Sequence, residues 1–242
     1  MRIVEVGKKT AHATQEFFAR LRRKYYGPIT HVQTSANLVA LTFDDGPHPK
    51  FTIELIRILR HFGAKATFFM VGKAASLNPE VVKLVVEEGH AIGNHSFSHI
   101  AFPHLDSAAR RDEISRCAEI LRPYGTKLFR PPYGVENMLC HRDARSLGYQ
   151  VVKWNVAVSD WEDNSGDWIA EGILQRLTAG SIVLLHDNLI MHHSLSAEPT
   201  DKREQTLDAV EKVLSRAGGK FKFCTVPELL KAGRPMTSFR RR

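Results

Sequence analysis

The sequence predicts a single α/β domain whose central sheet is built from parallel strands. Short apolar runs alternate with segments of helical periodicity, and 242 residues with 43% hydrophobic content suffice for one such domain with a large core. The polar residues suited to chemistry directly follow the apolar runs, at the carboxyl ends of the expected strands. Active sites lie at these ends in parallel α/β barrels, so we expect a (β/α) barrel joined by right-handed crossovers.

Residues 1–30 are predicted to form a basic helical extension that precedes a domain at 31–242. Within it, 12–26 has the pattern of an amphipathic helix, with Phe17, Phe18 and Leu21 on one side and basic residues elsewhere. Gly27-Pro28 would end this helix. We expect the helix to cap the domain, and contact with a membrane or a polyanion is the alternative.

From residue 37 onward, expected strands and helices follow one another. The strands are short apolar runs and the helices carry apolar residues at helical spacing. Pro79 is typical of a helix start, and Gly89 is typical of the position after a helix end. The expected strands are 37–42, 66–71, 90–93, 128–130, 150–154, 181–186 and 222–226. The expected helices are 52–62, 79–88, 107–121, 168–177 and 206–217.

The chain is basic, with 34 Lys and Arg against 26 Asp and Glu, a net charge of +8. This balance favours anionic partners and concerns association rather than fold. The basic residues are scattered and no aromatic-interleaved motif accompanies them. We therefore expect no nucleic-acid partner.

Cysteine usage and hydropathy bear on the compartment. The three cysteines lack CxxC spacing, which argues against a disulfide framework. No run of eighteen apolar residues occurs, so no transmembrane segment is predicted. The N-terminus lacks the apolar region of a secretory signal. We expect a cytoplasmic location if the chain is complete from Met1, and an extracytoplasmic one if a leader has been removed.

Two acidic residues and two histidines carry the strongest chemical signal. Asp44 and Asp45 lie in TFDDGPH, and His95 and His99 lie in NHSFSH. A spacing of four would place both imidazoles on one face of a helix, although a tight loop could also converge them. One aspartate with two histidines is the donor set of a catalytic metal with open positions. We expect one divalent ion, zinc for these donors, with cobalt, nickel or iron as alternatives.

Chemistry alone does not decide which aspartate binds the ion. Adjacent residues at a strand end point to opposite sides, so both cannot face the ion equally. One would bind, while the other would stay free as a base for water, as metal-assisted hydrolysis requires. Taken singly, HxxxH is typical of surface histidines and DDG of a turn. Their occurrence together, each after an expected strand, favours a metal site.

Five motifs in order resemble those of the polysaccharide deacetylase family, the NodB-homology domain of carbohydrate esterase family 4. The resemblance covers roughly residues 38–230, and any one motif alone would be weak or moderate support. The motifs are TFDDGPH at 42–48, HSFSH at 95–99, RPPYG at 130–134, SDW at 159–161 and IVLLHD at 182–187. The resemblance implies a distorted (β/α) barrel of about seven parallel strands in a catalytic domain at 31–242. It also implies metal-dependent removal of acetyl groups from N-acetylated or O-acetylated sugars.

Matched residue by residue, the resemblance gives each motif residue a role. Asp45, His95 and His99 would hold the metal, Asp44 would be the general base and His186 the general acid. A protonated His186 suits a leaving amine, which needs a proton.

The remaining motif residues would support this centre. Arg130 would hold Asp44, and Asp160 would orient His186, with Asp163 as a rival for that position. The backbone N–H of Tyr133 would help to stabilise the oxyanion. Pro131, Tyr133, Trp161 and Leu184 would contact the substrate, and the last two would wall an apolar pocket for the acetyl methyl group.

The expected function is therefore metal-dependent deacetylation of N-acetylglucosamine-containing glycans, either chitin oligomers or peptidoglycan, by a monomer. Two alternatives keep the hydrolytic centre: O-acetylated xylan, or a small non-sugar amide or imide. A lidded pocket would favour the small amide, and an open groove a polymer. A glycan-binding protein without catalysis is disfavoured because base, acid and metal ligands are all present.

Overall fold

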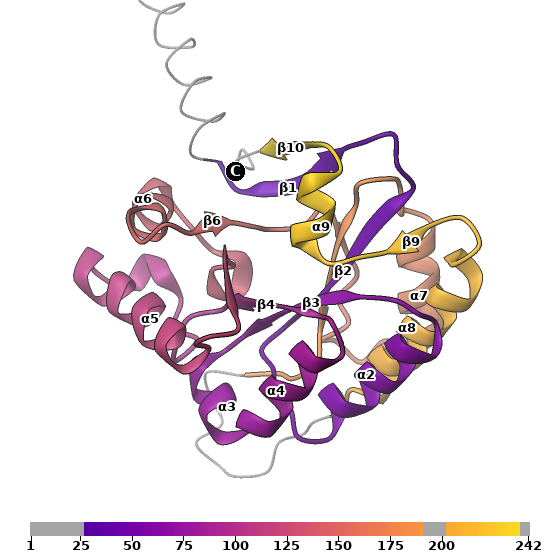
Figure 1. The fold of residues 1–242 in the computed structure, drawn as a ribbon, viewed down its shortest axis with the longest axis horizontal. Coiled ribbons are helices and arrows are strands. Elements are labelled where there is room, and N and C mark those ends of the chain that lie inside the picture. Colours follow the sequence, from indigo (N-terminus) through magenta and orange to yellow (C-terminus); the bar gives the residue numbers. More distant parts are fainter. Residues whose placement is uncertain (1–26, 191–201, 238–242) are drawn as a thin grey trace, which may run out of the picture.

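The computed structural model describes residues 27–190 and 202–237. Its centre is a curved parallel sheet that forms a half-barrel (Figure 1). Seven strands of the described chain follow the order β6-β5-β4-β3-β2-β8-β7, and β9 also pairs with β2. The predicted barrel of about seven parallel strands is confirmed. The strands are β2 (Leu38–Asp44), β3 (Ala66–Met70), β4 (Ala91–Asn94), β5 (Gly125–Phe129), β6 (Gln150–Val151), β7 (Val156–Ala157), β8 (Ile182–His186) and β9 (Lys222–Phe223).

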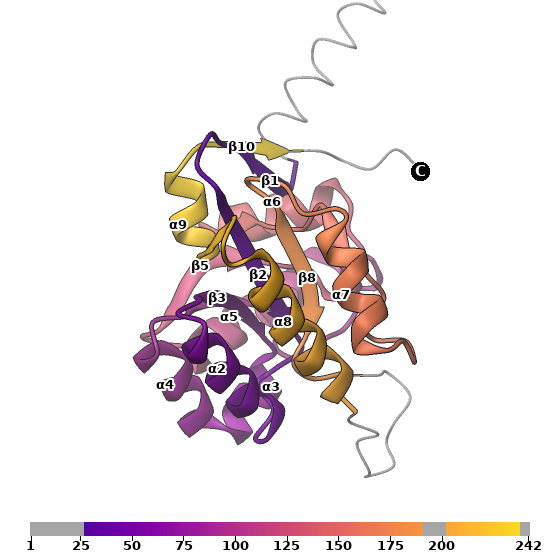
Figure 2. The same cartoon turned by 90° about the vertical axis from the view of Figure 1, so that its right-hand side faces the viewer.

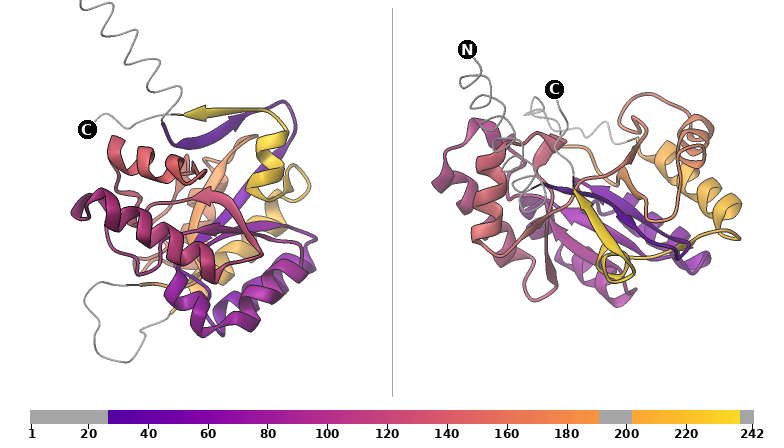
Figure 3. Two further views of the ribbon diagram at one scale, coloured as in Figure 1. Left: turned by 60° about the vertical axis from the view of Figure 1, so that its left-hand side comes forward. Right: turned by 90° about the horizontal axis from the view of Figure 1, so that it is seen from above.

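Helices surround the outside of this sheet (Figures 1 and 2). Helix α8 packs against both α2 and α7, while α5 packs against α3 and α6. Figure 3 shows from two further directions that the helices lie around the curved sheet. The helices are α2 (Phe51–His61), α3 (Gly72–Leu77), α4 (Pro79–Glu87), α5 (Ser107–Ile120), α6 (Met138–Ser146), α7 (Gly166–Leu174), α8 (Glu204–Ala217) and α9 (Val226–Lys231), with the 3₁₀ turns η1 (Phe102–His104) and η2 (Pro132–Gly134).

A two-stranded antiparallel ribbon closes one edge of the domain. It pairs β1 (Ile29–Gln33) with β10 (Arg234–Thr237) and joins the two ends of the described chain. This ribbon was not predicted from the sequence. Strand β1 starts at Ile29, two residues before the expected domain boundary at 31. The predicted basic helix at 12–26 lies outside the described residues.

Two expected strands end three residues earlier than predicted. The expected strand 150–154 ends at Val151, because the backbone N–H of Lys153 donates to Ile29 in β1 instead of continuing along β5. The expected strand 222–226 ends at Phe223, because Thr225 caps α9 through a reciprocal capping box with Glu228. Helices α3 and α9, with six residues each, and the two-residue β7 were not foreseen because each is too short for clear periodicity. The nine-residue α6 was not foreseen because its buried face mixes polar His141 and Asp143 with Cys140 and Ala144.

The central strands bring the chemical residues to one end of the sheet. Residues of β2 pair with β3 on one side and with β8 on the other, and Asp44 lies in register with His186. Phe43 and Phe68 stack in the core beneath, both fully buried. The apolar strands are thus buried on both faces and fix where their last residues lie. None of the described helices is long and apolar enough to cross a membrane.

Candidate active site

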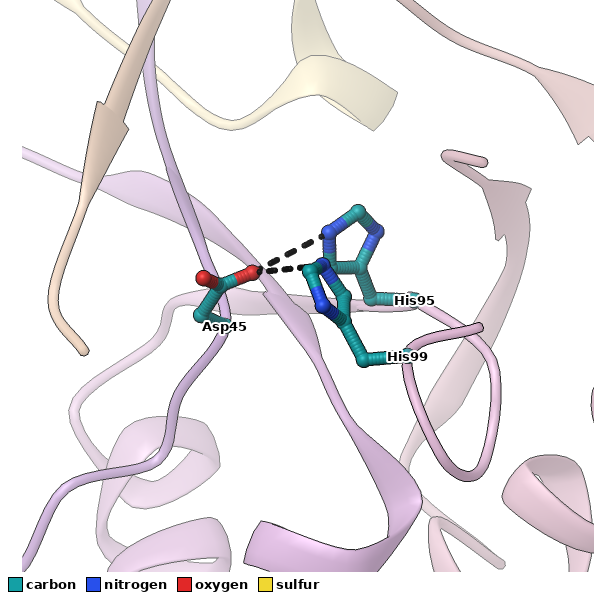
Figure 4. Close-up of side chains that lie close together, drawn as sticks. All are labelled: Asp45, His95 and His99. Atoms are coloured by element: carbon teal, nitrogen blue, oxygen red, sulfur yellow. Dashed lines mark ion pairs between the residues drawn. The ribbon is translucent and has the colours of Figure 1, made fainter. Parts of the chain in front are cut away.

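The predicted metal ligands converge from two loops (Figure 4). Asp45 follows β2, and His95 follows β4. The Nε2 atoms of His95 and His99 lie 3.3 Å and 3.1 Å from Oδ1 of Asp45. All three side chains are buried, and their potential ligand atoms lie within 4.8 Å of one another. The two histidines converge through a tight loop, which was one of the two arrangements expected, and not through a helix.

The chemistry of these donors fits a bound cation. Nδ1 of His95 lies 2.7 Å from the carbonyl oxygen of Arg130, which can only accept a hydrogen bond. This contact places the proton on Nδ1 and leaves a lone pair on Nε2, facing the Asp45 carboxylate. Two acceptors that face each other repel unless a cation lies between them or the ring gains a second proton. Metal-binding histidines commonly donate their other N–H to a backbone carbonyl in this way.

The second oxygen of Asp45 is also held. The backbone N–H of Ile190 donates to Oδ2 at 3.0 Å, so one oxygen stays directed at the histidines. Burial alone would raise the pKa of Asp45, but its contacts with His95 and His99 hold that pKa well below its usual range. Asp45 is therefore a carboxylate, as a metal ligand must be.

Asp44 lies beside this cluster and has a separate partner. Nη1 of Arg130 donates to Oδ1 of Asp44 at 2.6 Å. Oδ2 of Asp44 lies 3.7 Å from Nε2 of His95, whereas Oδ1 of Asp45 lies 3.3 Å from the same atom. Arg130 has a fully buried side chain, and burial lowers its pKa while Asp44 opposes that shift. The structure thus separates the two aspartates: Asp45 contacts both imidazoles, and Asp44 forms an ion pair with Arg130.

His186 lines the same pocket as Asp44 and is the last residue of β8, in register with Asp44 on β2. Its Nδ1 lies 2.9 Å from Oδ1 of Asp160, whose Oδ2 accepts from the His186 backbone N–H. Burial alone would lower the pKa of His186, but Asp160 with Asp45 and Asp44 raises it to about 9. Asp160 is fully buried, whereas its rival Asp163 is exposed. The structure pairs Asp160, and not Asp163, with His186.

Asp44, His186 and the Asp45–His95–His99 cluster line one pocket whose wall is largely apolar. Leu184 is buried in its wall, and the Trp161 ring meets the His186 ring edge-on with centroids 5.4 Å apart. Tyr133 lies at the pocket with its ring against His99. Pro131 is buried and does not line the pocket; its carbonyl oxygen accepts from Gly134 within the turn that carries Tyr133. The substrate contact of Pro131 and the oxyanion role of the Tyr133 N–H stay predictions.

Sequence reasoning missed several residues of this pocket. Trp154, Leu189 and Ile190 complete its apolar wall. Trp154 lies against Gly134, where an added Cβ would approach the ring within 2.4 Å, and Gly134 also has a positive φ of 59°. The glycine of RPPYG could have signalled such a close approach. No motif marks Leu189 or Ile190.

Asp187, the last residue of the fifth motif, packs against the turn that follows Asp45. It is buried, accepts a hydrogen bond from the Thr52 hydroxyl, and leaves no room for a Cβ at Gly46. Burial raises its pKa to about 7. Because Gly46 follows Asp45, this contact restrains the turn that presents the carboxylate.

Comparisons with known proteins agree with this geometry. The family model described as polysaccharide deacetylase matches residues 31–152. A peptidoglycan-N-acetylglucosamine deacetylase of Bacillus cereus is 34% identical over 202 residues, which are 81% of this chain and 69% of that protein. The chain belongs to the polysaccharide deacetylase family. The family and the enzyme class predicted from the five motifs, an amide-bond hydrolase, are thereby confirmed.

Other members of the polysaccharide deacetylase family show the same similarity. A chitooligosaccharide deacetylase of Sinorhizobium fredii is 32% identical over 197 residues, 78% of this chain and 90% of that protein. The crystal structure of a peptidoglycan N-acetylglucosamine deacetylase in complex with 4-naphthalen-1-yl-N-oxidanyl-benzamide superposes with a TM-score of 0.78. It is 30% identical, and the match covers 90% of this chain and 99% of that one. A family 4 carbohydrate esterase from Streptomyces lividans in complex with acetate gives a TM-score of 0.70 at 32% identity, over 86% and 100% of the two chains.

Proposed function

We propose that this protein removes acetyl groups from N-acetylglucosamine residues of a β-linked glycan, either peptidoglycan or a chitin oligomer. One observation carries the proposal. A carboxylate paired with a buried arginine and a histidine paired with a buried carboxylate line one pocket together with the Asp45–His95–His99 cluster. Such a pairing supports one group as a base and the other as an acid.

Asp44 would act as the base. It lines the pocket, and its ion pair with Arg130 keeps one oxygen occupied, so the other oxygen is the one available to take a proton from water. A divalent ion held by Asp45, His95 and His99 would polarise the acetamide carbonyl and activate that water. As the water oxygen bonds to the carbonyl carbon, its proton passes to Asp44.

His186 would act as the acid. Asp160 holds Nδ1, so Nε2 is the atom that can donate a proton. The high pKa of His186 keeps it protonated at neutral pH. Because an amine leaves poorly as an anion, the proton from Nε2 passes to the sugar nitrogen while the carbon–nitrogen bond breaks. The products are acetate and a glucosamine residue.

The rim of the pocket favours a polymer over a small amide. Tyr133 and Trp161 are 46% and 43% exposed although both line the pocket. Exposed aromatic faces at a pocket suit contact with sugar rings. The net charge of +8 further favours an anionic cell-wall glycan. The similar proteins of Bacillus cereus and Sinorhizobium fredii carry the names peptidoglycan-N-acetylglucosamine deacetylase and chitooligosaccharide deacetylase.

Zinc is the ion we propose, because one carboxylate and two imidazoles suit it among divalent metals. Cobalt, nickel or iron would be accepted by the same donors. Metal analysis of the purified protein, followed by removal and readdition of each ion, tests this choice.

Acetate release tests the function. The full chain loaded with zinc should release acetate from chito-oligosaccharides or peptidoglycan, and a chelator should abolish the release. Acetylated xylan and small N-acetyl amides are the comparison substrates, and faster turnover of either would replace the proposed substrate class. If the zinc-loaded protein released no acetate from any acetylated glycan, the proposed function would be wrong.

A further inference from the structure

A buried glutamate outside the five motifs holds the loop that carries both histidine ligands. Glu113 lies on α5 and is 7% exposed. Its Oε2 accepts hydrogen bonds from the backbone N–H groups of Phe97 and Ser98, at 3.0 Å and 2.8 Å. Its Oε1 accepts from the Ser98 hydroxyl at 2.7 Å. Every one of these contacts goes to the segment between His95 and His99.

Burial of this carboxylate needs a reason. Glutamate is seldom buried without a partner, since removing its charge from water is unfavourable. No ion pair to Glu113 occurs among residues 27–190 and 202–237. Its compensation instead comes from two backbone donors and one hydroxyl donor. Hydrogen bonds to a charged acceptor are stronger than neutral ones, so this contact can restrain the backbone it binds.

The loop needs such restraint because two of its residues adopt left-handed backbone conformations. Ser96 has a φ of 68° and His99 a φ of 60°. Non-glycine residues rarely adopt these angles and keep them where surrounding structure enforces them. Asn94 accepts from the Ser96 N–H, and the Ser96 hydroxyl accepts from the His99 N–H. The N–H groups of Gly72 and Lys73 donate to the carbonyl oxygens of Ser96 and Phe97. Glu113 accepts from the N–H groups of the two residues between, Phe97 and Ser98.

This conformation brings the two imidazoles together (Figure 4). Their ring centroids lie 5.0 Å apart, with both Nε2 atoms near Oδ1 of Asp45. Release of Phe97 and Ser98 would let the loop relax and separate His99 from His95. Outer contacts of this kind commonly change metal affinity tenfold to a hundredfold.

We propose that Glu113 is a positioning residue of the metal centre: its carboxylate sets the 95–99 loop in the conformation that aims both histidines at Asp45. This inference rests on the metal site of the proposed function. It predicts that Glu113 controls metal affinity without touching the metal or the substrate.

The test is zinc affinity of the metal-free full chain, measured by competition with a chromophoric chelator. Glu113→Ala removes all three contacts, and Glu113→Asp keeps the charge but withdraws the oxygens from the loop. Both should weaken zinc binding by about 10- to 100-fold. Glu113→Gln should lose less, because its amide oxygen can accept from both backbone N–H groups while its amide nitrogen donates to Ser98. Glu119→Gln, on the exposed side of α5, is the control and should bind zinc like the wild type.

Two further measurements separate the possible failures. Circular dichroism of the metal-free variants shows whether they fold. If Glu113→Ala does not fold, the zinc affinity of Glu113→Asp tests the role of Glu113. Excess zinc should restore deacetylation by the folded variants, which a general packing defect would not allow. If the wild type bound no zinc, the metal centre itself would be wrong. If the wild type bound zinc and folded Glu113→Ala and Glu113→Asp matched it within twofold, only the role of Glu113 would be wrong.

Discussion

The proposed base, Asp44, and the proposed acid, His186, are supported differently. On the base side, Arg130 pairs with Asp44, and its other donors go to Thr42 in β2 and to the carbonyl oxygens of Val152 and Lys153 beyond β6. Every one of these partners belongs to the sheet or to the segment that directly follows a strand. The Asp44 side is thus fixed by the same strand pairing that forms the barrel.

The acid side depends on a helix that arrives late in the chain. Asp160 holds His186, but Asp160 itself accepts from the hydroxyl of Thr206 in α8 and, through its carbonyl, from Arg203 just before that helix. Docking of α8 against α7 therefore completes this side. The proposed base is therefore held by the sheet and the segments that follow its strands, whereas the proposed acid also requires helix packing. Changes on the two sides should accordingly differ in kind.

The largest expected effect is loss of the base. Asp44→Asn should lower kcat/KM by about 10²- to 10⁴-fold, because an amide cannot accept the proton of water. Zinc content should stay at the wild-type level, since Asp45 and the two histidines remain. Acetate release and metal analysis on the same preparation check both statements. Loss of zinc together with activity would identify Asp44 as a ligand and contradict its separation from Asp45.

Loss of the arginine should affect stability most. Arg130→Met leaves Asp44 buried without its cation, and breaking such a pair costs about 3–5 kcal/mol in free energy of unfolding. Urea denaturation of the metal-free protein measures this change. The double variant Asp44→Asn with Arg130→Met is the matched control, and it should lose less because no uncompensated charge remains. Equal losses in the two variants would show that the ion pair is not the cause.

On the acid side the expected effect is a change of pH dependence. The proposed acid role requires a protonated His186, so activity should be lost as the pH rises through its pKa, which Asp160 raises. Asp160→Asn removes that charge, and the alkaline limb of kcat/KM should move down by about one to three pH units. Profiles recorded with saturating zinc measure the limb. Asp163→Asn, at an exposed position of the same loop, should leave it in place. If the alkaline limb of kcat/KM did not move in Asp160→Asn, Asp160 would not control the pKa of the acid.

The same contrast explains what the sequence could predict. Asp44, Arg130 and His186 each follow an apolar strand within a motif, so their meeting at one end of the sheet could be inferred from topology and resemblance. Thr206 lies in none of the five motifs and follows no apolar strand. Its contact with Asp160 arises from how α8 packs on α7. Strand β7 has only two residues, too few for any periodicity. Ribbon β1–β10 joins opposite ends of the chain, and no local pattern specifies that pairing.

The smallest expected effect tests whether α8 matters to the acid. Thr206→Val removes the hydroxyl that donates to Oδ2 of Asp160 at 3.1 Å, while the side chain keeps its shape. One hydrogen bond contributes about 0.5–1.5 kcal/mol, so kcat should fall about two- to tenfold. Thr206→Ser, which keeps the hydroxyl, should retain wild-type kcat. In the valine variant the backbone N–H of His186 still donates to Oδ2 of Asp160. The loss of activity in Thr206→Val should therefore stay below that in Asp160→Asn. If kcat in Thr206→Val equalled the wild-type value, the acid side would be as independent of helix packing as the base side.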